Sequence, residues 1–286
     1  MIPHLSMVLQ SLLYGFGDPI SKIAFDEIPV YTLLSFRYGI ALLTLLLLAG
    51  RKIMPAVKKS HPRDWLLPCL SVAFSYVCGN IAITLTAATS VAFIRSLSVV
   101  ITPLLAWIVF HKKLSWKYVP ILLGAILGLY LLCARGGLGN FGMGEIFALG
   151  AAALMAGSLV FGAQSLKKIE PLPLTALQIG ISLVVSLIPA LLWENDYQPQ
   201  GTSTEAWLIT LYLAILCSLT GFSLQNYALA HISARTVALI QCTCPVFTAL
   251  FSFLLLGENL SFLGITGAVL ITISVIASIW LDREKK

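Results

Sequence analysis

The feature that most constrains this chain is its series of long apolar segments separated by short loops. Charge, Pro or Gly interrupts the apolar sequence and leaves segments of about 20 residues, the length at which an α-helix crosses a bilayer. In lipid the backbone must satisfy its own hydrogen bonds, and the alternating pattern of a transmembrane barrel is absent. We therefore expect an all-α membrane protein with ten transmembrane helices. Their expected ranges are 4–24, 30–50, 64–87, 89–110, 116–135, 144–167, 172–193, 205–230, 233–256 and 261–281.

The composition agrees with a lipid environment. Of the 286 residues, 58% are apolar and only 10% are charged, whereas roughly a quarter are charged in a soluble domain. Too few polar groups remain to cover a water-facing surface. The net charge of +6 lies mostly in short clusters between apolar segments, which argues against a nucleic-acid partner. The six Cys show no metal-ligand spacing, so we expect no cofactor and no metal site.

Loop charge predicts the orientation, because Lys and Arg concentrate on the cytoplasmic side of a membrane. With a cytoplasmic N-terminus, fourteen of the eighteen Lys and Arg fall in inner loops or in the C-terminal tail. Only Lys22 and Arg135 fall in outer segments, while Arg37 and Arg95 lie inside spans. We expect a multi-pass protein of the cell (plasma) membrane with both termini in the cytoplasm.

The sequence also contains an internal repeat. A shift of 146 positions aligns residues 80–115 with 226–261 without a gap, and the identical pairs include Asn80/Asn226. We therefore divide the chain into a first repeat, residues 1–140, and a second repeat, residues 141–286. Five helices per repeat is an odd number, so the second repeat must insert upside down. Inverted repeats with a site at their interface are typical of alternating-access transporters.

Several short motifs resemble those of a known family. They are Tyr14-Gly15 with Lys22, Phe36-Arg37-Tyr38, Thr89-Ser90-Val91-Ala92-Phe93-Ile94, Thr102-Pro103-Leu104-Leu105-Ala106-Trp107, Tyr227-Ala228-Leu229, Pro245-Val246-Phe247 and Leu256-Gly257-Glu258. In this order and spacing the chain resembles the EamA-type transporters of the drug/metabolite transporter superfamily over nearly its whole length. The resemblance implies a ten-helix solute carrier, often an exporter of amino acids, other metabolites or drugs. At His111-Lys112 the chain departs from the Leu-Gly-Glu that the family usually repeats, so no role is carried over to that turn.

Two arginines inside the spans are candidates for solute binding and gating. A charge near the bilayer centre costs roughly 3 kcal/mol, so it persists only with a partner, a water-filled cavity or a function. Arg95 has Gln241 as its repeat mate, and Arg37 corresponds to Gln178. The first repeat thus carries charges where the second carries amides, and a cationic wall would orient a substrate carboxylate. The alternative is that each Arg pairs structurally with Asp18 or with a helix C-terminus.

Asp18 is the only acidic residue well inside a span. It lies within Gly15-Phe16-Gly17-Asp18-Pro19, where Gly and Pro weaken the helix and free backbone groups. We assign Asp18, Lys22 and Arg37 to coupling or gating, with Asp18 the candidate for proton coupling. A structural salt bridge from Asp18 to Lys22 or to a neighbouring Arg is the alternative. No second Asp lies inside a span, which excludes an aspartyl protease, and we expect no enzyme activity.

Polar and aromatic residues complete the expected substrate site beside Arg95 and Gln241. Such residues line a cavity or, alternatively, only hold helices together at about 0.6 kcal/mol each. The pairing of two Asn across the repeat favours the cavity, and two aromatic rings are suited to stacking on a flat solute. The expected additional lining residues are Tyr14, Tyr76, Asn80, Asn226 and Trp107.

The sequence predicts an alternating-access secondary carrier for a small organic metabolite, with proton coupling as a hypothesis, and the family resemblance implies export of solutes such as amino acids. No ATP-binding motif is present, so a gradient or the solute must supply the energy. The alternatives are a facilitative, channel-like permease and an exporter of drugs or toxic compounds. The expected partners are a small-molecule solute and the lipid bilayer. Gly124-x-x-x-Gly128 permits close packing within the fold or in a dimer, so monomer and homodimer both stay open.

Overall fold

Helices form all the regular structure that the computed structural model describes, which covers residues 2–86, 88–111, 116–133, 142–256 and 262–283. The α-helices are α1 (Ile2–Phe25), α2 (Val30–Lys59), α3 (Pro62–Leu85), α4 (Ala88–Ser96), α5 (Ser98–Phe110), α6 (Val119–Cys133), α7 (Met143–Ser165), α8 (Pro171–Trp193), α9 (Thr204–Tyr212), α10 (Gly221–His231), α11 (Ala234–Gln241), α12 (Cys244–Leu256) and α13 (Phe262–Arg283). Two 3₁₀ turns, η1 (Trp116–Tyr118) and η3 (Pro199–Gly201), and one π-helix, η4 (Leu213–Thr220), complete the elements.

Seven helices in the described part of the chain are long and apolar enough to cross a membrane. Large apolar side chains on their outer faces, such as Leu47 and Leu48, are exposed, as expected where lipid is the solvent. The chain is therefore an all-helical, multi-pass membrane protein. The seven are Val30–Lys59, Pro62–Leu85, Met143–Ser165, Pro171–Trp193, Thr204–His231, Ala234–Phe251 and Phe262–Leu281, and the shorter apolar helices are Ile94–Phe110 and Trp116–Leu131.

The expected helix boundaries lie close to the observed ones, with one correction at α2. The sequence predicts an end at residue 50, where charged residues begin, but α2 continues to Lys59 with Pro55 inside it. Charged residues mark where an apolar segment leaves the lipid. A helix continues past that point until its backbone hydrogen bonding is interrupted. Here the interruption comes at Ser60, just before Pro62.

Two of the expected helices are broken shortly before a proline. The segment 89–110 is divided at Leu97 into α4 and α5, and the segment 233–256 is divided around Thr243 into α11 and α12. A proline ring clashes with the carbonyl four residues back and disturbs the preceding turn. Pro245 comes directly after the second break and accounts for it, whereas Pro103 lies inside α5, six residues after Leu97. The shift of 146 residues relates Leu97 to Thr243, so the breaks fall at equivalent positions of the repeat.

The span Thr204–His231 contains a feature that no sequence pattern predicts, the π-helix η4 between α9 and α10. Within it Thr220 Oγ1 donates a hydrogen bond of 2.9 Å to the carbonyl of Ile215, five residues back. A π-helical turn is wider than an α-helical turn and is frequent at functional sites. The Sγ of Cys217 reaches the carbonyl of Leu13 on α1 at 3.5 Å, so η4 lies directly against α1.

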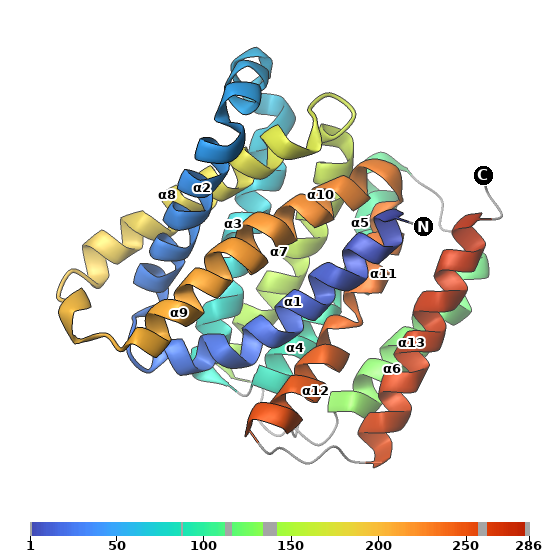
Figure 1. The fold of residues 1–286 in the computed structure, drawn as a ribbon. Helices are drawn as coiled ribbons and strands as arrows, with labels where there is room; N and C mark the ends of the chain where they lie inside the picture. The colour runs from blue at the N-terminus through green and yellow to red at the C-terminus, as the bar shows by residue number, and fades with distance from the viewer. Residues whose placement is uncertain (1, 87, 112–115, 134–141, 257–261, 284–286) are drawn as a thin grey trace.

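Helix α1 lies among helices of the second half of the chain, beside α9, α10, α11 and α12 (Figure 1). Two glycines allow this close approach. A Cβ at Gly15 would lie 2.4 Å from Phe247 Cβ, and one at Gly17 would lie 2.9 Å from Cys217 Sγ. α1 runs unbroken through Pro19, so the glycines that suggested a weakened helix serve close helix packing.

Helices α6 and α13 pack against each other at one side of the bundle (Figure 1). A Cβ at Gly128 would lie 2.8 Å from the carbonyl oxygen of Gly267, and one at Gly124 would lie 2.8 Å from Ser274 Oγ. The sequence leaves two uses open for Gly124-x-x-x-Gly128, packing within the fold and packing in a dimer. In the structure this glycine face packs within the fold, against α13.

Candidate functional site

A polar cavity of about 70 Å³ lies where α1 meets α3, η4 and the two helix breaks. This volume has room for several water molecules. Irregular backbone is tolerated inside a membrane where it lines such a cavity, which accounts for the position of both breaks. The lining residues are Gln10, Ser11, Tyr14, Gly17, Asp18, Ser21, Arg37, Tyr76, Asn80, Ala92, Arg95, Ser96, Ser98, Met155, Leu213, Cys217, Ala238, Gln241, Cys242, Cys244 and Pro245.

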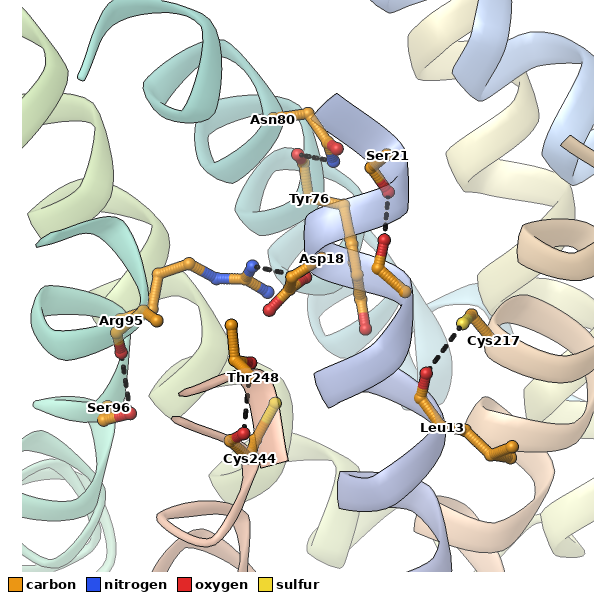
Figure 2. Close-up of polar contacts among 12 residues, drawn as sticks. Leu13, Asp18, Ser21, Tyr76, Asn80, Arg95, Ser96, Cys217, Cys244 and Thr248 are labelled. Carbon is orange, nitrogen blue, oxygen red and sulfur yellow. Dashed lines mark hydrogen bonds and ion pairs between the residues drawn. The ribbon is translucent and has the colours of Figure 1, made fainter. Parts of the chain in front are cut away.

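An ion pair joins α1 and α4 across this cavity (Figure 2). Arg95 Nη1 lies 3.9 Å from Asp18 Oδ1, and the two side chains are 19% and 24% exposed. This distance is too long for a hydrogen bond, so the pair is loose. Gly79 on α3 gives the guanidinium its space, since a Cβ there would lie 3.3 Å from Arg95 Nε. The partner of Asp18 is thus a neighbouring Arg, while Lys22 is exposed.

Arg37 on α2 is the more deeply buried cation of the cavity, at 4% exposed. Its Nε donates a hydrogen bond of 2.5 Å to Ser218 Oγ, which η4 presents. Its Cζ lies 5.7 Å from the ring centroid of Tyr38 and 5.5 Å from that of Tyr76. Arg95 Cζ lies 5.7 Å from the same Tyr76 ring. Two guanidinium groups therefore share one aromatic ring, whose π face attracts both.

Tyr14 and Tyr76 bring two buried hydroxyls to the cavity. The rings meet edge to face with their centroids 6.3 Å apart. Tyr14 lies against α10 at Gly221, where a Cβ would come within 2.8 Å of the Tyr14 hydroxyl oxygen. Neither hydroxyl has a hydrogen-bond partner among the described residues. Buried polar atoms without partners are rare in folded proteins, and these two belong to cavity-lining side chains.

The second half contributes an amide network. Gln225 Oε1 accepts hydrogen bonds from Gln10 Nε2 at 3.0 Å and from Gln241 Nε2 at 2.9 Å. These bonds tie α10 to α1 and to α11. Gln10 and Gln241 also line the cavity, so the network forms part of its wall, which we call the amide wall.

Asn226, expected in the substrate site, lies in a buried contact between α10 and α8. Its Nδ2 donates to Gln178 Oε1 at 2.7 Å and to Thr175 Oγ1 at 2.9 Å. Its repeat mate Asn80 lines the cavity and donates to the Tyr76 carbonyl at 2.7 Å (Figure 2). Equivalent positions in the repeat therefore have different surroundings.

Trp107 and Lys22 also lie outside the cavity that we expected them to line or gate. Trp107 is 55% exposed on α5, so its ring contacts lipid rather than a solute in the cavity. Lys22 lines a separate surface cavity with Asp26. The predicted residues that the structure brings together around the central cavity are Tyr14, Asp18, Arg37, Tyr76, Asn80, Arg95 and Gln241.

Sequence reasoning did not single out Gln10, Tyr38 or Ser218. Gln10 was detectable as an isolated amide in an apolar segment. Ser218 was not, because its position beside Arg37 depends on the π-helix. Within the described residues, no three His, Cys, Asp or Glu side chains group in the way that metal ligands do.

Two further cavities, of about 340 and 380 Å³, are lined by helix ends that lie at opposite ends of the bundle. The helices themselves can be followed in Figure 1. The smaller is lined by the ends of α1 and α3, including residues 83–86. The larger is lined by α5, α7, α10 and the start of α11, including residues 229–232. The shift of 146 residues relates 83–86 to 229–232, so the same part of the repeat lines one cavity at each end.

Comparison with known proteins agrees with a transporter. The chain is 25% identical to an uncharacterized transporter of Archaeoglobus fulgidus over 99% of this chain and 98% of that protein. It is 24% identical to the uncharacterized transporter YwfM of Bacillus subtilis over 84% of each chain. One crystal structure shares the fold with a TM-score of 0.80 at 15% identity, over 99% of this chain and 98% of the other. The family model described as the EamA-like transporter family matches residues 1–134 and 142–280. The chain therefore belongs to the EamA-like transporter family.

Proposed function

We propose that this EamA-family transporter is a secondary active carrier that exports small organic metabolites such as amino acids across the cell membrane. The central cavity carries the proposal, because it holds Asp18, Arg37 and Arg95 at a depth where unpaired charge is costly. Ionisable side chains inside a helical membrane protein typically mark the path of a solute or an ion.

We take the chain as ten spans in two inverted repeats, residues 1–140 and 141–286. The packing supports this division, because the main contacts recur when each span is exchanged for its mate. α3 packs on α7 as α10 packs on α1, α5 packs on α7 as α12 packs on α1, and the pairs α2–α8 and α6–α13 are each their own mates. The loop charges support a cytoplasmic position for both termini.

The cavities at the two ends support alternating access. We take residues 83–86 and their mates 229–232 as lining the two mouths of one path. Because the repeats are inverted, they can exchange conformations, so that one mouth closes when the other opens. The α1 residues Tyr14, Gly17 and Ser21 line the central cavity, and their mates Val160, Ala163 and Lys167 line the larger end cavity. In this scheme the first repeat lines the central cavity and the second lines the larger end cavity, and the two repeats exchange these roles when the carrier reorients.

We further propose that Asp18 couples transport to protons. Its carboxylate borders the cavity and lies only loosely beside Arg95, so it is accessible to a proton from cavity water. In proteoliposomes with an imposed pH gradient, we expect Asp18→Asn to transport solute without responding to the gradient. Asp196→Asn, which changes an exposed carboxylate in the loop after α8 that lines none of the three cavities, is the matched control. Unchanged coupling in Asp18→Asn would remove this assignment.

Counterflow in proteoliposomes tests the carrier mechanism itself. A carrier is saturable, and unlabelled solute inside the vesicle accelerates the entry of labelled solute outside. A channel-like permease shows neither property. We expect trans-stimulation with at least one small metabolite, and flux that rises linearly with concentration without trans-stimulation would favour the permease.

A further inference from the structure

The central cavity carries one more cation than anion. Arg37 and Arg95 line it with a single carboxylate, that of Asp18. Asp18 lies beside Arg95, so these two charges offset each other. Arg37 has no carboxylate within 4.0 Å among the residues that the structure describes. A buried guanidinium without a counter-charge is strongly unfavourable, and an anionic ligand relieves it.

Arg37 also has unused hydrogen-bond donors. A guanidinium carries five N–H donors, and in the described contacts of Arg37 only Nε is engaged, with Ser218 Oγ. This bond fixes the guanidinium plane from η4. The two terminal nitrogens remain, and their spacing matches the two oxygens of a carboxylate.

Three neutral polar atoms of the same cavity make no well-formed hydrogen bond among the described residues, although the Tyr14 side chain lies beside those of Tyr76 and Gln10. They are the hydroxyls of Tyr14 and Tyr76 and the Oε1 of Gln10. Tyr76 is 4% exposed and Gln10 is 0% exposed, yet both line the cavity. A tyrosine hydroxyl can donate to a carboxylate oxygen, and an amide oxygen can accept from a hydroxyl of the same solute. Leaving such groups unpaired in the interior is unfavourable, so their unmet capacity points to a ligand.

We propose that Arg37 anchors the carboxylate of a monoanionic solute, to which the hydroxyls of Tyr14 and Tyr76 also donate. The inference rests on the proposed transport function and narrows its solute class to small monocarboxylates whose remaining groups are neutral, which excludes the zwitterionic amino acids from that class. One negative charge balances Arg37 while Asp18 and Arg95 stay paired. A zwitterion would add a positive charge to a cavity that already has an excess, and a dicarboxylate would leave a negative charge unmatched. The anchor is thus Arg37, whereas the sequence alone favours Arg95.

Thermal unfolding of the purified full chain with matched pairs of probes tests the solute class. The probes are aliphatic, hydroxylated and aromatic monocarboxylates, each with its own amide and its α-amino derivative. We expect at least one carboxylate to raise the unfolding temperature while its amide and its zwitterionic derivative do so weakly or not at all. The class is overturned if no carboxylate stabilises the protein more than its amide does.

Variants then test the anchor with the best carboxylate. We expect Arg37→Gln to weaken binding by about 100-fold, Arg37→Lys by about tenfold because the fork is lost, and Tyr14→Phe by about threefold to tenfold. Lys52→Gln removes an exposed cation on α2 that lines none of the three cavities, and it should leave the affinity unchanged. Arg37→Lys and Tyr14→Phe preserve charge or ring, so they report on binding even if Arg37→Gln folds poorly. Equal affinity in wild type, Arg37→Lys and Tyr14→Phe overturns the anchor.

Counterflow separates this inference from the transport function. Counterflow of a neutral or zwitterionic solute with no carboxylate preference leaves the carrier proposal standing and removes the inference. A carboxylate that binds through Arg37 but is never transported leaves the inference standing and removes the carrier proposal.

Discussion

The two walls of the central cavity differ in how fully their polar groups are bonded. On the amide wall, Gln225 accepts two hydrogen bonds of 3.0 and 2.9 Å and joins three helices. On the charged wall, Asp18 and Arg95 approach only to 3.9 Å, and Arg37 has one hydrogen bond. A satisfied network holds helices in place, whereas a partly satisfied one has capacity left for a ligand. A polar side chain inside a membrane protein is therefore a candidate for ligand binding only where its charge or its hydrogen-bonding atoms lack partners in the protein.

The largest effect on stability should come from the amide wall. Gln225→Leu removes the shared acceptor and leaves the amide groups of Gln10 and Gln241 without it. We expect a loss of about 2 kcal/mol in unfolding free energy, measured as a lower unfolding temperature in a fixed detergent. Gln241→Leu, which removes one of the two bonds, should cost about half as much. If Gln225→Leu unfolds like wild type but no longer binds solute, the amide wall is the binding wall and the comparison is reversed.

The charged wall should respond in the opposite way. Asp18→Asn keeps the shape of the side chain but removes the charge beside Arg95. Because the pair is already loose and borders the cavity, we expect a smaller loss of unfolding free energy than for Gln225→Leu. Solute flux should nevertheless fall at least tenfold under a pH gradient. A fall in unfolding temperature as large as that of Gln225→Leu would show that the pair is structural.

The same comparison explains what could be predicted from the sequence. Apolar segment length and turn residues gave nearly all the helix boundaries, because each depends on local sequence. The charged wall was also predictable, since Asp18, Arg37 and Arg95 are conspicuous in apolar spans. Bonding partners were not predictable, because they depend on how helices pack. Asn226 looked equivalent to Asn80 but bonds to α8.

Two other features escaped prediction for related reasons. The π-helix that presents Ser218 to Arg37 has no residue pattern of its own. The exposure of Trp107 on α5 depends on how that helix packs, which the apolar sequence around it does not display. Both are consequences of tertiary packing, which a single sequence does not display.

Replacing Trp107 should have little effect on either wall. The side chain is 55% exposed on the outside of α5, so Trp107→Leu exchanges one lipid-facing apolar group for another. We expect a stability change within about 0.5 kcal/mol and an unchanged affinity for every solute tested. Saturation curves for aromatic and aliphatic solutes provide the measurement. A loss of affinity confined to aromatic solutes would return Trp107 to the substrate site.

The smallest effect is expected at Glu27, a carboxylate outside the expected spans that resembles Gln225 in making two hydrogen bonds. It lies between α1 and α2, and its two oxygens accept hydrogen bonds from the Ser203 backbone N–H at 2.6 Å and the Ser203 hydroxyl at 2.7 Å. These two bonds hold the pKa of Glu27 below its usual value. A group with a lowered pKa in the folded state stabilises the fold above its unfolded-state pKa, here about 4.3.

That stabilisation is lost as the pH falls through the folded-state pKa of Glu27. Glu27→Gln should therefore lower the unfolding temperature slightly at neutral pH, and the difference from wild type should vanish in acid. Asp196→Asn, in the loop after α8, is the matched control. We expect its difference in unfolding temperature from wild type not to disappear in acid. If Glu27→Gln instead changes solute affinity while Asp18→Asn does not, then full bonding does not separate structural carboxylates from functional ones in this protein. The distinction between the two cavity walls would then have to rest on charge alone.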